Sequence, residues 1–158
     1  MKPIELTSSA FSDQAGIPAR YLSARAGGEN ISPPLTWSGT PEAALSLALT
    51  VVDLAPVAHM WVHWAVVDIP PSVSSLPEGA SGAGIPPGAR ELRNTAYTIG
   101  WSGPKPPPGT GEHPYVFTVY ALDIERLELP AQPTAQQIEQ AVRGHVLGQG
   151  SLTGLCGT

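Results

Sequence analysis

Apolar runs alternate with short turn segments along the whole chain. Three runs rich in β-branched or aromatic residues predict strands at 45–52, 62–69 and 115–122. Segments such as SGTP, PPS and SGPKPPPGTG separate the apolar runs and are typical of turns. Because the second and third runs are apolar on both faces, we expect those two strands to be central and covered. The pattern predicts an all-β core.

One segment, following a proline, predicts a helix. Thr134 can cap it and Gln137 completes a capping box. Apolar residues at helical spacing continue to Gly148, with His145 or Val146 on the apolar face. On that face, we expect His145 to be a core histidine with its hydrogen bonds satisfied rather than a ligand.

The composition predicts one turn-rich domain spanning residues 1–158. A chain of 158 residues is long enough to bury a core without disulfides or a metal. Gly and Pro are abundant, at 17 and 18 residues, whereas charged residues make only 13% of the chain, about half the average share. A surface so poor in charge favours self-association, and we expect a homodimer.

Charge and cysteine content narrow the partners and the compartment. The net charge is −5 and no cluster of Lys and Arg occurs, so nucleic acid is not expected as a partner. The single cysteine, Cys156, predicts an inert thiol in a reducing compartment. The first residues lack the apolar run of a signal peptide, and polar residues interrupt the apolar stretch 45–69. We therefore expect a cytoplasmic protein without integral membrane association.

The motif HMWVHW at 59–64 raises the question of a metal site. His59 and His63 would share a helical face as zinc-protease histidines do, but Met60 stands where that motif carries its glutamate. On a strand the two histidines lie about 13 Å apart, too far for one zinc ion. We expect no metal and no cofactor. Because the sequence contains neither a Gly-x-Ser-x-Gly motif nor a phosphate-binding loop, no catalytic residue is assigned.

Two strands each begin with an aromatic residue and a histidine on one face. Period two places Trp61 beside His63 and His113 beside Tyr115. The turn at Asp53 precedes the first pair, and a Pro- and Gly-rich loop precedes the second. If they converge, they form a small pocket suited to a compact anion such as a phosphate monoester. The alternative is that both pairs are core or interface residues.

The motifs, in their order, resemble the phosphatidylethanolamine-binding protein family. They are DLAP at 53–56, WVHW at 61–64 with VVDIP after it, GPKPPPG at 103–109 and HPYVF at 113–117. The chain is most similar to the bacterial branch of that family, often called Raf kinase inhibitor-like. With NISPPLTW near the start and GHVL near the end, the resemblance spans nearly the whole chain.

The resemblance implies a mainly β fold of two antiparallel sheets packed together with a few peripheral helices. It implies a ligand pocket for phosphate-like or phospholipid head groups, and in some animal members a restraint on kinases. It implies no defined reaction. The pocket residues carried over by position are Asp53, Pro56, Trp61, His63, Gly103, Pro107, His113 and Tyr115.

Two departures from the family pattern affect the pocket. The first motif is usually Asp-Pro-Asp-Ala-Pro, and the form here is one residue shorter. Asp53 matches the first aspartate of the motif only if the alignment contains a gap. Without a gap, Val52 takes that position. The usual arginine between the histidine and the tyrosine is Pro114, which removes a cation and a backbone donor. The charge of an anion would then fall to His63, His113, backbone amides and Lys105.

Three functions remain open on this reading. The first is a non-catalytic binding protein for a small phosphorylated or other anionic ligand, which could modulate kinase signalling. The second is a kinase or protease inhibitor that acts by protein–protein contact. The third is a hydrolase that uses His63 and Asp53 as base and orienting residue. For the binding function, we expect affinity to fall as pH rises from about 6 to 8, because imidazolium is lost.

Overall fold

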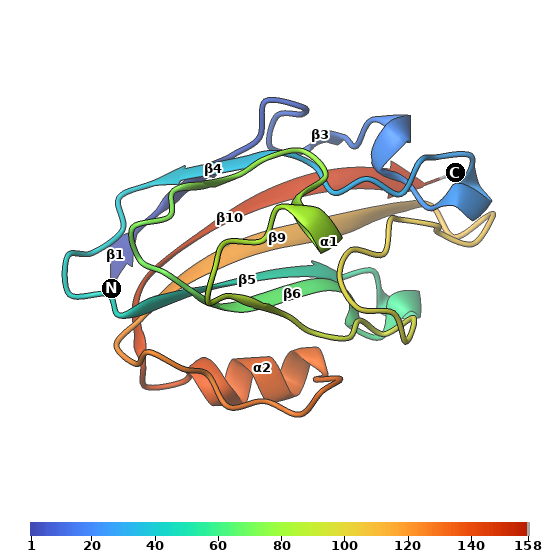
Figure 1. Ribbon diagram of the computed structural model, residues 1–158. Helices are drawn as coiled ribbons and strands as arrows, with labels where there is room; N and C mark the ends of the chain where they lie inside the picture. The colour runs from blue at the N-terminus through green and yellow to red at the C-terminus, as the bar shows by residue number, and fades with distance from the viewer. Residues whose placement is uncertain (158) are drawn as a thin grey trace.

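The computed structural model describes residues 1–157 and contains two β-sheets of unequal size (Figure 1). The larger sheet has seven strands in the order β1-β10-β9-β5-β6-β8, with β3 also paired to β10, and the smaller has the order β2-β4-β7. All long strands pair antiparallel, while the two-residue strands β1 and β3 pair parallel to β10. The expected mainly β fold of two sheets with few helices is confirmed.

The elements have the following bounds. The strands are β1 (Lys2–Pro3), β2 (Glu5–Thr7), β3 (Ala15–Gly16), β4 (Leu35–Ser38), β5 (Ser46–Asp53), β6 (Trp61–Ile69), β7 (Ser75–Leu76), β8 (Arg90–Glu91), β9 (Glu112–Leu122) and β10 (Val146–Gly157). The helices are α1 (Ala80–Ala83) and α2 (Ala135–Val142), with 3-10 turns η1 (Ala19–Tyr21), η2 (Ala24–Ala26) and η3 (Pro56–Ala58). In the described part of the chain, no helix has the length and apolarity to cross a membrane.

The three predicted strands are present as β5, β6 and β9, with ends within three residues of the predicted ones. Every residue of β5 is buried, and so is every residue of β6 after Trp61. Strand β9 is central as expected, between β5 and β10, whereas β6 lies nearer the edge of the sheet, with only the two-residue β8 on its other side.

The predicted helix begins as expected but ends earlier. The Thr134–Gln137 capping box is present, and the helix stops at Val142, after which the chain enters β10. The expectation for His145 was wrong. Its side chain is 42% exposed and its Nδ1 lies 2.8 Å from the Asp123 carboxylate, because the helix ends before it could face the core.

Strand β10 is the long element that the apolar pattern did not predict. Its sequence, VLGQGSLTGLCG, has glycine where a strand pattern would place larger side chains. Glycine is required at two of these positions because other parts of the chain pack directly against the strand backbone. A Cβ at Gly150 would lie 1.8 Å from the Ile4 carbonyl oxygen, and one at Gly154 would lie 2.5 Å from Ile17.

Apolar side chains cover both faces of the large sheet. One core, which includes Trp37, Leu49 and Phe117, lies between the large and small sheets. The other, which includes Ala48 and Ile138, lies between the large sheet and α2 (Figure 1). Because β5 and β9 contribute to both cores, polar side chains on these strands have little access to water and need partners within the protein.

Two irregularities in β6 coincide with its two buried polar residues. The pairing with β5 jumps from Val51–Trp64 to Val52–Val62, which leaves His63 as the extra residue of a bulge. A second register shift lies between the pairs Leu49–Val66 and Leu47–Ile69. Asp68, whose φ is 57°, lies within it. Bulges bend a strand and redirect its side chains, so both polar groups are placed by breaks in the ladder.

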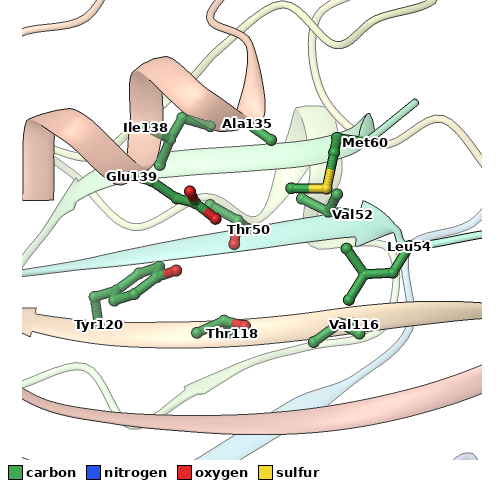
Figure 2. A pocket seen from close by; sticks show the side chains of 10 residues that line it. All are labelled: Thr50, Val52, Leu54, Met60, Val116, Thr118, Tyr120, Ala135, Ile138 and Glu139. Atoms are coloured by element: carbon green, nitrogen blue, oxygen red, sulfur yellow. The ribbon is translucent and has the colours of Figure 1, made fainter. Parts of the chain in front are cut away.

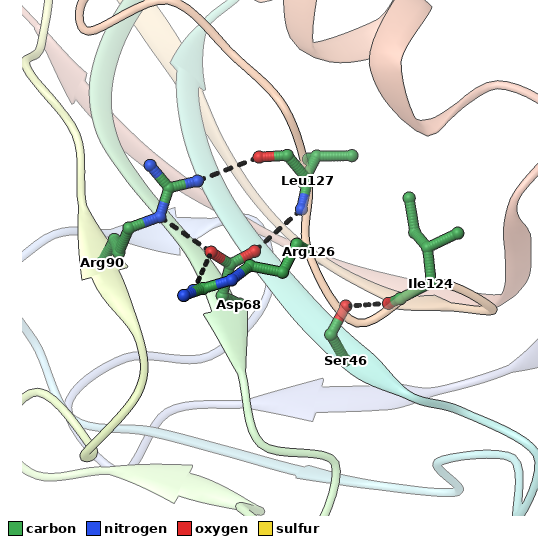
Figure 3. Close-up of polar contacts among 6 residues, drawn as sticks. All are labelled: Ser46, Asp68, Arg90, Ile124, Arg126 and Leu127. Atoms are coloured by element: carbon green, nitrogen blue, oxygen red, sulfur yellow. Dashed lines mark hydrogen bonds and ion pairs between the residues drawn. The ribbon is translucent and has the colours of Figure 1, made fainter.

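Asp68 fastens the far end of β6 to two neighbouring segments (Figure 3). Its Oδ2 accepts from Arg90 Nε at 2.7 Å and from Arg126 Nη1 at 3.2 Å, and its Oδ1 accepts from the Leu127 backbone N–H at 2.8 Å. Arg90 also donates to the Leu127 carbonyl oxygen at 2.9 Å. One buried carboxylate thus holds β8 and the segment that leads to α2 against β6.

We expect Asp68→Asn to destabilise the fold by about 2 kcal/mol, because charge-assisted hydrogen bonds are lost from a buried site. Asparagine tolerates positive φ, so the substitution removes the charge without adding backbone strain. Urea denaturation followed by tryptophan fluorescence measures the change. Asp123→Asn, on an exposed carboxylate, is the control and should shift stability by under about 0.5 kcal/mol. Equal effects of the two substitutions would contradict the role of Asp68.

Candidate functional site

A pocket of about 780 Å³ opens at the end of the large sheet where β5 ends and β6 and β9 begin. Its walls come from those strands, from η2 and from the loops at 95–98 and 102–107. Pockets of this size accommodate small organic ligands. The volume is larger than the small pocket for a compact anion expected from the sequence.

Seven of the eight residues predicted for the pocket line it. These are Asp53, Trp61, His63, Gly103, Pro107, His113 and Tyr115. The eighth, Pro56, is exposed and lies outside the lining, where its neighbours Val57 and Ala58 take its place. The reason is local, since Pro56 begins the 3-10 turn η3 and the turn presents its later residues to the pocket.

The buried pair of Asp53 and His113 joins β5 to β9 at the base of the pocket. Asp53 Oδ2 lies 2.7 Å from His113 Nδ1, and Asp53 Oδ1 accepts from the Ala55 backbone N–H at 2.9 Å. His113 Nε2 lies 2.8 Å from Thr110 Oγ1, whose proton goes to the Pro107 carbonyl oxygen at 2.7 Å. Both ring nitrogens of His113 are therefore engaged in hydrogen bonds within the protein.

His63 has one ring nitrogen bonded and the other free. Its Nδ1 donates to the Ser102 carbonyl oxygen at 2.7 Å. The other ring nitrogen, Nε2, has no partner among the described residues, and His63 lines the pocket. Burial lowers the pKa of His63 below its ordinary value of 6.5, although the Ser102 carbonyl and the Asp53 charge act in the opposite direction. The neutral ring offers a lone pair to the pocket.

Tyr115 lies between the two histidines. Its ring is 5.0 Å from His63 in an edge contact and 6.3 Å from His113 in a stacked one. Burial raises the pKa of Tyr115 well above its ordinary value, and the adjacent Asp53 carboxylate adds to the effect. Tyr115 is therefore a neutral hydroxyl at all physiological pH values.

Gly103 has a structural reason to be glycine. A Cβ on it would lie 2.5 Å from the backbone of residues 21–23. Its N–H donates to Asn30 Oδ1 at 2.7 Å, and the Ser23 N–H donates to the Pro104 carbonyl oxygen at 3.1 Å. The loop at 102–107 is thus held to the N-terminal part of the chain. The Gly103 amide is used within the protein and is not free to bind an anion.

Cations gather at the mouth of the pocket. Arg25, on η2, and Lys105, on the neighbouring loop at 102–107, are exposed and both line it. Lys105 was expected as a contributor, whereas Arg25 and Asn30 were missed. No motif near Arg25 distinguishes it in the sequence, and only the contact of Gly103 with residues 21–23 brings it to the site. Arg25 supplies a cation at the rim, whereas Pro114, between His113 and Tyr115 on β9, does not line the pocket.

The structure assigns the pocket carboxylate to Asp53. Val52, the alternative without a gap, faces the opposite side of the sheet beside α2 (Figure 2). The hydrogen bonds also separate Asp53 from His63, since the carboxylate pairs with His113. Among residues 1–157, no serine, threonine or cysteine side chain is hydrogen-bonded to His63. Asp53, His113 and Thr110 are connected in series, but Thr110 does not line the pocket.

The fold is that of a two-sheet β-protein with a pocket at one end of the large sheet. The chain belongs to the phosphatidylethanolamine-binding protein family, whose sequence profile matches residues 7–157.

Similar proteins come from archaea and bacteria. A UPF0098 protein of Methanothermobacter thermautotrophicus is 41% identical over 153 residues, covering 96% of this chain and 97% of the relative. A Mycobacterium tuberculosis relative, provisionally named lipoprotein LppC, is 39% identical over 153 residues, covering 97% and 72%. The crystal structure of Escherichia coli YbcL, described as a new member of the mammalian PEBP family, has a TM-score of 0.90 at 32% identity and 98% coverage of both chains.

We expect Gly103→Ala to destabilise the protein by about 1–3 kcal/mol, because the added methyl group overlaps backbone atoms that cannot move independently. Thermal unfolding monitored by circular dichroism measures the loss. Gly16→Ala is the matched control, since its nearest atom would be 4.0 Å away. A Gly103→Ala protein as stable as Gly16→Ala would contradict the close approach of the loop.

Proposed function

We propose that the protein is a non-catalytic binding protein, a single domain whose pocket takes a phosphate monoester or a phosphorylated head group. The observation that carries the proposal is the free Nε2 of His63 in a 780 Å³ pocket with Arg25 and Lys105 at its mouth. An imidazole nitrogen accepts a proton from the ligand or donates one to it, and the two cations attract a negative group.

The pairing of Asp53 with His113 allows an anion to bind close to a buried carboxylate. A lone buried carboxylate would repel a phosphate, but here His113 and the Ala55 backbone N–H occupy the two oxygens of Asp53. In this proposal His113 does not contact the ligand, because both of its ring nitrogens are used. It holds Asp53 and the loop at 107–110 in place, and His63 makes the direct contact.

The pocket has room for an organic group as well as a phosphate. Val57, Trp61 and Tyr97 line the mouth and are 51%, 38% and 72% exposed. Aromatic and aliphatic side chains at the rim would pack against the carbon atoms of a head group or of a phosphorylated side chain. If the ligand is a side chain of a kinase or a protease, the same rim supports the inhibitor function.

The remaining parts of the proposal concern the cellular location and the oligomeric state of the protein. We propose a cytoplasmic location, supported by the single unpaired Cys156. A homodimer is supported by exposed apolar side chains such as Leu54, Tyr97 and Ile99.

We expect His63→Ala to weaken binding of O-phosphorylethanolamine at least tenfold, because the free imidazole nitrogen Nε2 of His63 is removed. Isothermal titration calorimetry at low salt measures the affinity, and His145→Ala, outside the pocket, is the control. Unchanged affinity in His63→Ala would refute the contact. A turnover assay on phosphate and acyl esters tests the hydrolase alternative, and a hydrolysis rate that depends on His63 would replace the proposed function.

We expect the affinity for a sulfate monoester, which does not itself titrate in this range, to fall as pH rises. The anion favours imidazolium, so binding raises the pKa of His63 from a free value that burial has placed below 6.5. Affinity is therefore highest below the free pKa and declines until pH passes the pKa of the complex. Because burial lowers the pKa of His63, the fall in affinity starts at a lower pH than the value of about 6 expected from the sequence. His63→Ala should show no such decline, and an identical pH profile in both proteins would contradict this role.

A further inference from the structure

A second, smaller groove lies on the other face of the large sheet (Figure 2). Its floor is formed by β5 and β9, and α2 forms one wall. The volume is about 120 Å³. Successive strand residues point to opposite faces, so Val52 borders this groove while Asp53 borders the anion pocket. The two sites share the strands β5 and β9 but no lining residue.

The groove is polar at one end and apolar at the other. Glu139 points from α2 toward Thr50, and Tyr120 lies beside them on β9 (Figure 2). Leu54 and Met60 close the opposite end, where both are exposed, at 46% and 42%. An occupant that follows this gradient has one polar group and a short apolar chain.

The polar end carries a single negative charge. Glu139 is the only charged residue that borders the groove, and among the described residues its carboxylate has no ion-pair partner. Burial raises the pKa of Tyr120, as does the nearby Glu139 charge, so the phenol remains neutral. A neutral phenol ring and a carboxylate are two groups that attract an organic cation.

The apolar end is built at a cost in backbone strain. His59 and Met60 have φ values of 50° and 59°, in the left-handed region that costs about 1–2 kcal/mol for each non-glycine residue. The turn made by these two residues presents Met60 to the groove. Strain of this kind gathers at ligand sites.

We propose that this groove binds a short organic monocation, a primary alkyl- or arylalkylammonium with about four to eight heavy atoms. The ammonium group lies between the Glu139 carboxylate and the Tyr120 ring, and the chain covers Val52 and Val116 toward Leu54. The size follows from the volume, since a cavity of about 150 Å³ accepts benzene. The preference for a cation follows from the unpaired carboxylate.

The test is a titration of ¹⁵N-labelled protein with hexylammonium, followed by ¹H–¹⁵N correlation spectra at low salt. We expect saturable shifts of the Val52, Val116 and Thr118 amides, and none from 1-hexanol or hexanoate at equal concentration. Glu139→Gln should raise the dissociation constant at least fivefold, while Glu128→Gln, also on an exposed glutamate, should leave it unchanged. Leu54→Ala should reduce the preference for hexylammonium over propylammonium.

Three results would overturn the proposal. They are equal binding of the amine and the alcohol, an unchanged dissociation constant in Glu139→Gln, and shifts confined to the anion pocket around His63. A circular dichroism spectrum identical to wild type ensures that the Glu139→Gln result reports binding and not loss of α2. Because the groove shares no residue with the anion pocket, failure of either site leaves the other unaffected.

Discussion

The structure depends on one constraint, which is that the central strands of the large sheet are covered on both faces. Water cannot reach polar side chains there, so each must find a partner within the protein. The constraint is met, since no buried polar side-chain atom in residues 1–157 lacks a hydrogen bond. At the far end of β6, Asp68 takes three donors. At the pocket end, Asp53 is bonded to His113, while Nε2 of His63 has no partner among the described residues. That nitrogen is not one of the buried atoms, because it is reached from the pocket, and it is the candidate group for binding a ligand.

The bulges of β6 explain how one strand can serve both the core and the site. A regular strand would alternate strictly, so His63 and Trp64 would face opposite sides. The extra residue at His63 breaks that alternation. His63 packs against Tyr115, while Trp64 packs against Trp101 in the core that also includes Tyr115. The same device at Asp68 brings a carboxylate to two arginines. Bulges next to functional residues are a recurrent way to redirect a side chain.

The sequence predicted those parts of the fold that depend on local pattern. The strands β5, β6 and β9 follow from their β-branched and aromatic residues, and the start of α2 follows from its capping box. Strand β10 could not be predicted, because glycines such as Gly150 are explained by the approach of Ile4 from the other end of the chain. The motifs identified seven of the pocket residues by position, but not how they are bonded. That both nitrogens of His113 are used depends on Asp53 and Thr110, and no spacing rule indicates it.

The two candidate sites differ in charge because the fold treats their carboxylates differently. Asp53 is buried, and a buried carboxylate needs partners within the protein, so it is bonded to His113, whereas the cations Arg25 and Lys105 lie exposed at the mouth. Glu139 is exposed on α2, and an exposed carboxylate needs no partner because water solvates it. In the two proposals, one face of the sheet therefore takes an anion and the other a cation, although each site contains a carboxylate. Under these proposals, burial decides whether a carboxylate must be paired, and so which sign of ligand each face attracts.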